Sequence, residues 1–329
     1  MKRFFHIFIP FIAVLSFIAC GETEDVGITP RFSDLSDNTT TSIQVSLPRV
    51  LNTESTPEGQ SFEVYITVTD QDENLISQLN ASNFALYYAC ENGKLVCLER
   101  FAFSFIRQRI SMALAITMDY SGSMSPDDIL HMETAVREFV QLLEPFDEVQ
   151  IIKFSDDVQV MNDFTSDRTE ILDAIDAPFP SGSTAFFQAI YEGLQNLNSH
   201  ENSSADHLFP IVIAFTDGGD NSSTASLQEV MDLSVIYQVP VYTVGLGGVD
   251  HTVMRAIAEY SGARYYFTPT SAGIIQAFQT ISSQVSNFYR ADFVLTEPGC
   301  DQMEVMVDVT YRNALGDHQG SGKKTYVFP

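Results

Sequence analysis

Residues 112–124 read MALAITMDYSGSM, an almost wholly apolar run that ends on the carboxylate of Asp119. Two hydroxyls follow at alternate positions, Ser121 and Ser123, with a glycine between them. Three oxygens at alternate positions can hold a metal ion, but a calcium loop would normally place several acids in such a stretch. This loop has a single acid. The stretch therefore predicts a buried strand that ends in an oxygen-rich loop with little charge of its own.

Downstream of this run, short apolar segments alternate with longer amphipathic ones. The apolar segments are EVQIIKFS, LFPIVIAFTDG, VPVYTVGLG and ARYYFTP. Helix signals mark the intervening segments, beginning with Ser125 as an N-cap and Pro126 at the first helical position. Apolar strands flanked by helices are typical of a parallel sheet that is covered on both faces. The pattern predicts an α/β domain over residues 111–290, built on a doubly wound, mostly parallel sheet.

The segments on either side of this domain have the alternating pattern of β-strands. SIQVSLPRV, FEVYITVTD, NFALYYAC and LVCLERFAF fall within residues 42–110. The same pattern returns in RADFVLTE, MEVMVDVTYRN and KKTYVFP. Residues 291–329 are too few to bury a core of their own. We therefore expect them to complete the β-structure of residues 42–110, so that the α/β domain is inserted into a small all-β domain.

The amino terminus reads MKRFFHIFIPFIAVLSFIACGETED. Two basic residues precede an apolar run that is short for a spanning helix and typical of a secretory signal. The tail FIAC resembles a bacterial lipobox, in which residues 1–19 are a lipoprotein signal peptide and Cys20 is lipidated as the first mature residue. A plain secretory signal with an incidental cysteine is the alternative. Residues 20–41 are acidic and poor in large apolar groups, which predicts a flexible tether.

Four cysteines occur in this exported context, in which disulfides form. With Cys20 lipidated, an odd number remains: Cys90, Cys97 and Cys300. The segment YYACENGKLVCLERF has an NG turn signal between two short runs rich in β-formers, which predicts a hairpin. The arms of that hairpin could bring Cys90 and Cys97 face to face. We therefore favour a Cys90–Cys97 disulfide over a bridge from either residue to Cys300.

The charge of the chain excludes one class of partner. There are 17 Lys and Arg against 43 Asp and Glu, a formal net charge of −26 at pH 7. A field of that sign repels phosphate backbones and anionic lipid headgroups, so binding to nucleic acid is not expected. Beyond the amino-terminal run, no stretch is apolar for long enough to span a bilayer, so membrane attachment would depend on the lipid on Cys20.

Two further oxygen groups are placed to join the loop after Asp119. Thr184 lies in the loop PSGST just before a helical segment, and Asp217 follows the apolar run IVIAFT. Open α/β sheets bind ligands outside the carboxyl ends of their strands. Because the carboxyl ends of parallel strands share one edge, we expect these groups to form one site. The candidate residues are Asp119, Ser121, Ser123, Thr184 and Asp217.

In order and spacing this set resembles the metal-ion-dependent adhesion site of von Willebrand factor type A domains. That site consists of D-x-S-x-S after a first strand, a threonine in a Gly-Ser-Thr loop and an aspartate in T-D-G. All five residues match, and the resemblance covers about residues 110–288. It implies a Rossmann-like fold and a divalent ion, Mg²⁺ or Mn²⁺, with Ca²⁺ as a further candidate.

The resemblance also implies a role for each residue. The hydroxyls of Ser121, Ser123 and Thr184 bind the ion, while Asp119 and Asp217 act largely through water. Hard oxygen ligands suit Mg²⁺ and Mn²⁺. Neutral hydroxyls leave the ion undercompensated, so it would bind a carboxylate from another molecule.

The leading hypothesis is therefore an adhesion-type, protein-binding module without enzymatic activity, which captures an Asp or Glu side chain of a protein ligand. It would be exported and lipid-anchored in a bacterial cell envelope, at the outer membrane or the cell surface, and would have no small-molecule substrate. A first alternative is a scaffold subunit of an envelope assembly, with the β-domain as its interface and a structural metal. A second is a metal-assisted hydrolase, since metal-bound water can be a nucleophile. The sequence shows no recognisable general base beside the expected ligands, so the hydrolase is the weakest of the three.

Overall fold

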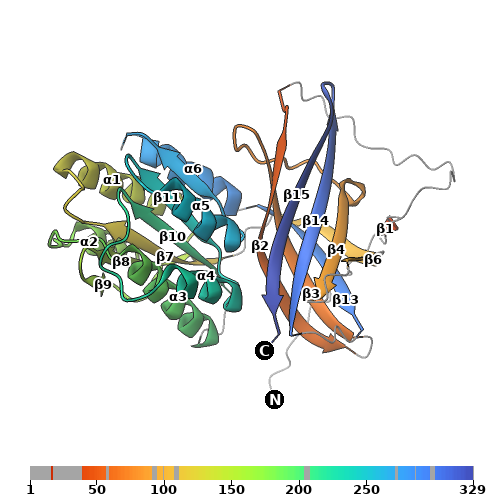
Figure 1. The fold of residues 1–329 in the computed structure, drawn as a ribbon, viewed down its shortest axis with the longest axis horizontal. Helices are drawn as coiled ribbons and strands as arrows, with labels where there is room; N and C mark the ends of the chain where they lie inside the picture. Colours follow the sequence, from red (N-terminus) through yellow and green to blue (C-terminus); the bar gives the residue numbers. More distant parts are fainter. Residues whose placement is uncertain are drawn as a thin grey trace, which may run out of the picture.

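Two bodies lie side by side in the part of the chain that the structure describes (Figure 1). One is an α/β body formed by the middle of the chain, and the other is a β-sandwich formed by segments from both ends. The computed structural model describes residues 16–17, 39–56, 59–90, 95–98, 100–106, 111–203, 208–270, 273–285, 287–296 and 301–328.

A six-stranded sheet forms the centre of the α/β body. Its order is β12-β11-β10-β7-β8-β9, and each neighbouring pair is parallel except β8 and β9. The strands are β7 (Met112–Asp119), β8 (Glu148–Phe154), β9 (Val158–Val160), β10 (Phe209–Thr216), β11 (Val241–Leu246) and β12 (Tyr265–Thr268). Every residue of β7, β10 and β11 is buried, because helices cover both faces of the sheet. The predicted doubly wound, mostly parallel sheet is confirmed.

The helices form two groups, one on each face of this sheet. They are α1 (Pro126–Leu142), α2 (Arg168–Asp176), α3 (Phe186–Ser203), α4 (Leu227–Ile236), α5 (His251–Tyr260) and α6 (Ile274–Val285). On one face α1, α2 and α6 share a core that includes Phe139, Ile171 and Phe278. On the other face α3, α4 and α5 share a core that includes Ile190 and Val230. The sequence did not predict α2 or β9, because such short elements have few periodic positions.

The β-sandwich consists of two sheets that share one core. One has the order β1-β6-β13-β3-β2 and the other the order β15-β14-β4-β5. Phe62 and Tyr289 of the first sheet pack in the same buried cluster as Leu86 and Val305 of the second. The elements are β1 (Ser16–Phe17), β2 (Ile43–Thr56), β3 (Gly59–Asp70), the 3₁₀ helix η1 (Ala81–Asn83), β4 (Phe84–Cys90), β5 (Leu95–Cys97), β6 (Arg100–Ile106), β13 (Phe288–Leu295), β14 (Gln302–Asn313) and β15 (Gly316–Val327).

Strands from the two ends of the chain interleave in these sheets. β13 lies between β6 and β3, and β14 lies between β15 and β4. Ile106 at the end of β6 pairs directly with Phe288 at the start of β13. The α/β body is thus inserted between two adjacent strands. β13 begins at Phe288, earlier than the boundary expected at residue 291.

Two details of the β-sandwich differ from the expected strands. The run LVCLERFAF divides into β5 and β6, which belong to different sheets. β2 continues through Pro48, where its pairing with β3 shifts register between Ser46 and Arg49. Proline has no N–H to donate, and a bulge in this edge strand accommodates it.

The predicted hairpin is present, with β4 antiparallel to β5. Its register places Cys97 opposite Tyr87, whereas Cys90 lies further along β4 on the other face of the strand. The Cys90–Cys97 pairing therefore stays a prediction, and one that this register disfavours. Cys90 is disulfide-bonded, but its partner lies outside the described side chains. Cys20, the side chain of Cys97, and Cys300 all lie outside them.

Most of the leader and tether, residues 1–15 and 18–38, also lies outside the described residues. The two-residue strand β1 falls within the expected signal peptide. Within the ranges that the structure describes, no helix combines the length and the apolar character needed to cross a membrane.

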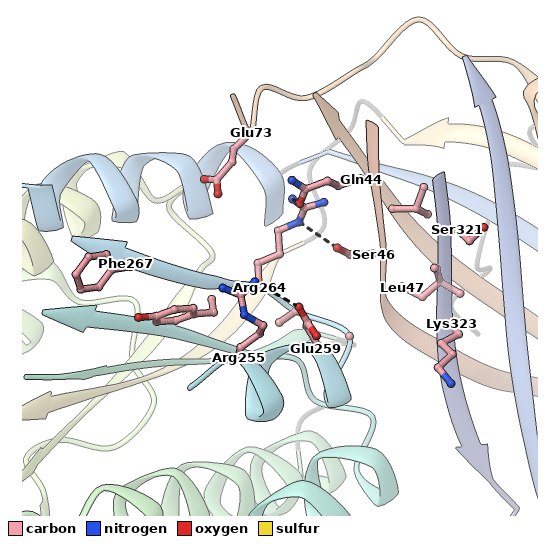
Figure 2. Close-up of a pocket in the computed structure, with 15 residues that line it drawn as sticks. Gln44, Ser46, Leu47, Glu73, Arg255, Glu259, Arg264, Phe267, Ser321 and Lys323 are labelled. Atoms are coloured by element: carbon pink, nitrogen blue, oxygen red, sulfur yellow. Dashed lines mark hydrogen bonds and ion pairs between the residues drawn. The ribbon is translucent and has the colours of Figure 1, made fainter. Parts of the chain in front are cut away.

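Turns at the amino-terminal edge of the six-stranded sheet contact the β-sandwich. Gln238, just before β11, accepts a hydrogen bond from Val50 N at 3.1 Å and donates one to the Thr325 carbonyl at 2.8 Å. Arg264, just before β12, donates to Ser46 Oγ at 3.1 Å. A cleft of about 550 Å³ lies between the two bodies here (Figure 2). Because these turns precede strands, the β-sandwich lies at the edge opposite the carboxyl ends of the strands.

Lys324 of β15 is buried in this contact between the two bodies. Its ammonium group donates to the carbonyl of Ser261. Burial, together with the nearby charge of Arg49, lowers the pKa of Lys324 to about 7. At neutral pH the fold therefore holds an amine that would ionise more readily in the unfolded chain.

Lys324→Met should flatten the pH dependence of stability between pH 7 and pH 10. The unfolded lysine keeps its proton up to about pH 10.4, so the unfolded state binds more protons over this range and wild-type stability rises with pH. The shift corresponds to a gain on the order of 4 kcal/mol across the window, and none below pH 7. Urea unfolding of both proteins across this pH range measures the difference. Equal slopes for wild type and variant would show that Lys324 is not desolvated in the folded protein.

Candidate metal-binding site

Asp119 ends the central strand β7, and its side chain is fully buried. One carboxylate oxygen, Oδ1, accepts the backbone N–H of Ser121 at 2.7 Å. The other, Oδ2, accepts the hydroxyl of Thr216 at 2.6 Å. The first bond folds the loop back over the strand end, and the second ties β7 to its neighbour β10. The carboxylate is thus fixed in position by the fold itself.

The serine hydroxyls lie beside this carboxylate. Ser121 Oγ and Ser123 Oγ are 3.1 Å apart, and Ser123 Oγ donates to Asp217 Oδ1 at 2.6 Å. Asp217 directly follows β10, the strand next to β7. The parallel pairing of these two strands therefore brings together residues that are far apart in sequence.

Thr184 enters the group from a third loop, the one that leads into α3. Its backbone N–H donates to Asn221 Oδ1 at 2.9 Å, and its carbonyl accepts the N–H of Asn221 at 3.0 Å. A Cβ placed on Gly218 would lie 3.5 Å from Ser123 Oγ and 3.9 Å from Thr184 Oγ1. Both hydroxyls therefore border the same small space beside Gly218. Ser121 and Asp217 join these two residues through contacts with Ser123, and Asp119 accepts the N–H of Ser121, so the structure brings all five residues expected from the sequence to one edge of the sheet.

Supporting residues of the site escaped the sequence reasoning. Thr216 orients Asp119, and it precedes Asp217 in the T-D-G motif, so its place in the chain could have indicated it. The carbonyl of Gly182 accepts the N–H of Gly122 at 2.8 Å and joins two of the loops. Asn221, in the loop after β10, bonds to Thr184 and so joins that loop to the one that leads into α3. The sequence offers no signal for these loop-to-loop contacts, because they depend on the assembled sheet.

Burial makes the negative charge of the two carboxylates costly. Desolvation raises the pKa of Asp119 to about 6, although hydrogen bonds from Thr216 and Ser121 oppose the shift; the charge of Asp217 adds to it. Desolvation also raises the pKa of Asp217, and the charge of Asp128 contributes. A cation bound beside these groups would favour their ionised forms. The electrostatics therefore favour a positive ligand at this edge of the sheet.

The donor set fits a small divalent ion. Mg²⁺ binds oxygen at 2.0–2.1 Å in octahedral geometry, so adjacent ligands lie about 3 Å apart. The 3.1 Å between Ser121 Oγ and Ser123 Oγ agrees with that spacing. Across the described residues, no three His, Cys, Asp or Glu side chains meet as a metal site, so coordination here would depend on hydroxyls. Ser121, Ser123 and Thr184 would hold the ion, and Asp119 and Asp217 would support it.

Comparison with known proteins places the middle of the chain in a family. The sequence profile of the von Willebrand factor type A domain matches residues 114–281, just over half of the chain. An uncharacterized protein of Synechocystis is 23% identical over 185 residues, which cover 55% of this chain and 43% of that protein. The voltage-dependent calcium channel subunit alpha-2/delta-2 of mouse is 24% identical over 213 residues, which cover 62% of this chain and 18% of that protein. The chain thus spans less than half the length of these relatives.

Two solved structures overlap with this chain at low sequence identity. A von Willebrand factor type A protein from Catenulispora acidiphila has a TM-score of 0.49 at 14% identity, covering 87% of this chain and 73% of that one. Proximal thread matrix protein 1 from the mussel byssus, solved with zinc in its MIDAS motif, has a TM-score of 0.48 at 18% identity, covering 54% and 48%. The profile match extends from the central strand β7 into the last helix α6. The chain belongs to the von Willebrand factor type A domain family.

Proposed function

We propose that this protein is a divalent-metal-dependent, adhesion-type binding module that captures an Asp or Glu side chain of a protein partner. Domains of this family mediate binding between proteins, and some do so through a metal site. In this chain Ser121, Ser123, Thr184, Asp119 and Asp217 would form that site, with Mg²⁺ or Mn²⁺ as the ion.

One observation carries this proposal: the hydrogen-bonded cluster of serine hydroxyls and carboxylates at the carboxyl ends of β7 and β10. Three of the five proposed site residues, Ser121, Ser123 and Thr184, are neutral, so an ion held there keeps much of its charge and favours an anion from outside. The cluster also lies at the edge of the sheet that faces away from the β-sandwich. That position leaves it accessible to a second molecule.

We further propose that the molecule is exported and anchored to a bacterial envelope through Cys20. Two features of the sequence support this arrangement: the lipobox-like tail and the acidic tether that follows it. The proposed parts of the chain after the signal peptide are residues 20–41, 42–110, 111–290 and 291–329. In it, the β-sandwich lies between the tether and the α/β body. The metal site then points away from the membrane, towards a partner outside.

The two alternatives make different demands on the site. A scaffold role would leave the metal structural, so metal removal should lower thermal stability but not release the partner. A hydrolase needs a general base, but both oxygens of the buried Asp119 are engaged within the fold, and the hydroxyl that Asp217 Oδ1 accepts belongs to Ser123, a proposed metal ligand. This geometry favours binding over catalysis.

Thr184→Ala should abolish metal-dependent binding without unfolding the protein. The purified protein would be presented, with Mg²⁺, to a displayed library of random peptides, and captured peptides eluted with EDTA. Loss of a direct ligand should weaken metal binding at least as much as loss of an outer-shell partner, which costs roughly 10–100-fold, so recovery should fall to background. The control is Thr280→Ala, which removes an exposed hydroxyl of α6 that bonds only locally, to the carbonyl of Gln276. Peptides that remain bound to the wild-type protein in the presence of EDTA would refute the proposed function.

A further inference from the structure

A small pocket opens directly beside the proposed metal site. It has a volume of about 150 Å³ and lies between the amino-terminal ends of α3 and α5 and the loop after β10. Its walls are formed by Phe186, Phe187, Gly218, Gly219, Val253 and Met254. A cavity of about this size accommodates a benzene-sized group. The pocket is therefore large enough for one apolar side chain.

The pocket adjoins the space around the metal ligands at Gly218. Gly218 lines it, and a Cβ on Gly218 would come within 4 Å of both Ser123 Oγ and Thr184 Oγ1. A Cβ on the next residue, Gly219, would meet nothing within 4 Å. The two glycines thus leave the passage from metal site to pocket open. A ligand chain could cross it with one side chain on the ion and a neighbouring side chain in the pocket.

Acids occupy the rim of this pocket. Asp220 Oδ2 accepts the N–H of Phe187 at 2.9 Å, at the start of α3. Asp250 Oδ1 accepts the N–H of Thr252 at 2.9 Å, at the start of α5. These bonds fix both carboxylates in place and compensate the positive ends of the two helices. The described residues that line the pocket include no basic side chain.

The negative rim is part of a wider field. The charge of Asp128 acts on Asp217 from the start of α1, and the whole chain has a formal net charge of −26. Such a field repels an acidic partner and speeds the approach of a basic one. The proposed ion itself still requires a carboxylate ligand from the partner. A fitting partner must therefore present a single acid within a basic surface.

We infer that the pocket lined by Phe187 and Met254 is a specificity subsite of the metal site. It takes a Leu, Ile, Met or Phe side chain that stands within two residues of the partner's metal-binding acid, and Lys or Arg residues of the partner face the rim formed by Asp220 and Asp250. This inference rests on the proposed function, because the acid must bind the ion. It adds a sequence requirement for the partner that the metal alone would not impose.

Gly219→Leu tests this inference by adding a branched side chain to the wall of the pocket. Its backbone is not in the left-handed region, and its Cβ would be unobstructed, so the variant should fold. Gly248→Leu is the matched control: Gly248 follows β11 at the same edge, its Cβ would also meet nothing within 4 Å, and it does not line the pocket. The probe is a displayed library of random peptides with a fixed central Asp, captured with Mg²⁺ and eluted with EDTA.

Peptides enriched on the wild type should carry an apolar residue near the Asp and basic residues around it. Burial of such a side chain is worth a factor of roughly 10 to 100 in affinity. Gly219→Leu should lose that factor for the enriched peptides, whereas Gly248→Leu should keep it. The rise in Tm that Mg²⁺ produces should be equal in all three proteins.

Two results would overturn the inference while leaving the proposed function intact. One is EDTA-sensitive enrichment of acids without an apolar or basic preference. The other is equal peptide affinity for Gly219→Leu and wild type. Peptide capture that EDTA does not release, or no capture at all, would instead refute the proposed function, and the subsite with it.

Discussion

Asp119→Asn is expected to abolish the rise in Tm that Mg²⁺ produces and, at the same time, to stabilise the metal-free protein. Loss of this charge should weaken metal binding by roughly 100-fold, the upper end of the cost of losing an outer-shell partner, because the ion loses its buried counter-charge. At an ion concentration of 100 times the wild-type Kd, the wild type gains about 2.7 kcal/mol and the variant a small fraction of that. Differential scanning calorimetry with Mg²⁺ and with EDTA measures both effects.

The gain of the metal-free variant follows from the raised pKa of Asp119, about 6 in the folded protein. Ionising an acid whose pKa is higher in the folded than in the unfolded state lowers the free energy of unfolding. For Asp119 this penalty is absent below the unfolded pKa of about 3.9, grows as the pH rises to 6, and is complete above pH 6. The penalty is on the order of 3 kcal/mol, and an imperfect replacement of the two hydrogen bonds reduces the gain to about 1–2 kcal/mol. The advantage of asparagine should therefore be full at pH 7, vanish near pH 5 and become a small loss near pH 4, where the weaker hydrogen bonds of asparagine are the main remaining difference.

A matched control comes from another fully buried aspartate of the same sheet. Asp147 precedes β8, and its two oxygens accept N–H groups of Met112 at 3.0 Å and Glu144 at 2.8 Å, far from the hydroxyl cluster. Asp147→Asn should lower stability and leave the Mg²⁺-induced rise in Tm unchanged. An Asp119→Asn protein that keeps that rise would show that Asp119 does not support the ion.

The largest loss of stability is expected from Gly262→Ala, at the contact between the two bodies. Gly262 has φ +81°, and a Cβ there would lie 2.1 Å from the carbonyl oxygen of Leu47 in β2. The left-handed backbone alone costs about 1 kcal/mol, and the overlap forces the strand away from the turn at a further cost of about 2–3 kcal/mol. We expect Tm to fall by roughly 6–12 °C.

Gly247→Ala separates these two costs. Gly247 has φ +65°, but a Cβ there would meet nothing within 4 Å, so only the backbone term applies. Calorimetry of the two variants should show a much smaller loss for Gly247→Ala, about 1 kcal/mol. Equal losses would mean that the contact between Gly262 and Leu47 is loose in solution.

The sequence predicted the α/β body well, because each central strand is a continuous apolar run with a helix signal after it. MALAITMD corresponds to β7 residue for residue. The sandwich was predicted in outline only, since strands of similar alternation can pair in many orders. The division of LVCLERFAF between two sheets, and the register that separates Cys90 from Cys97, depend on tertiary packing, and local sequence contains no signal for either.

The candidate site was predictable for a different reason. Its residues lie at strand ends or in loops beside them, and parallel strands must bring their carboxyl ends to one edge, so sequence position alone implied that Asp119 and Asp217 lie at the same edge of the sheet. The pocket beside them was not predictable. It depends on the side-by-side placement of Phe187 and Met254, from helices that follow different strands, and on the space left open by Gly219. Shape of this kind emerges only from the assembled fold.

The pairing of Ile106 with Phe288 also determines how the molecule would bear tension. If a partner holds the metal site while the tether is fixed, the pull on the α/β body enters the sandwich through β6 and β13 at the same end. β13 is bonded along its length to β3, from the pair Tyr289 and Ile66 to the pair Leu295 and Gln60. The tether enters the sandwich at Ile43, which pairs with Asp70 at the same end of β3, so the two loads act on neighbouring strand ends and would open these hydrogen bonds one by one from that end. Insertion between two adjacent strands thus predicts that tension on the α/β body would open the sandwich from the end where that body is attached.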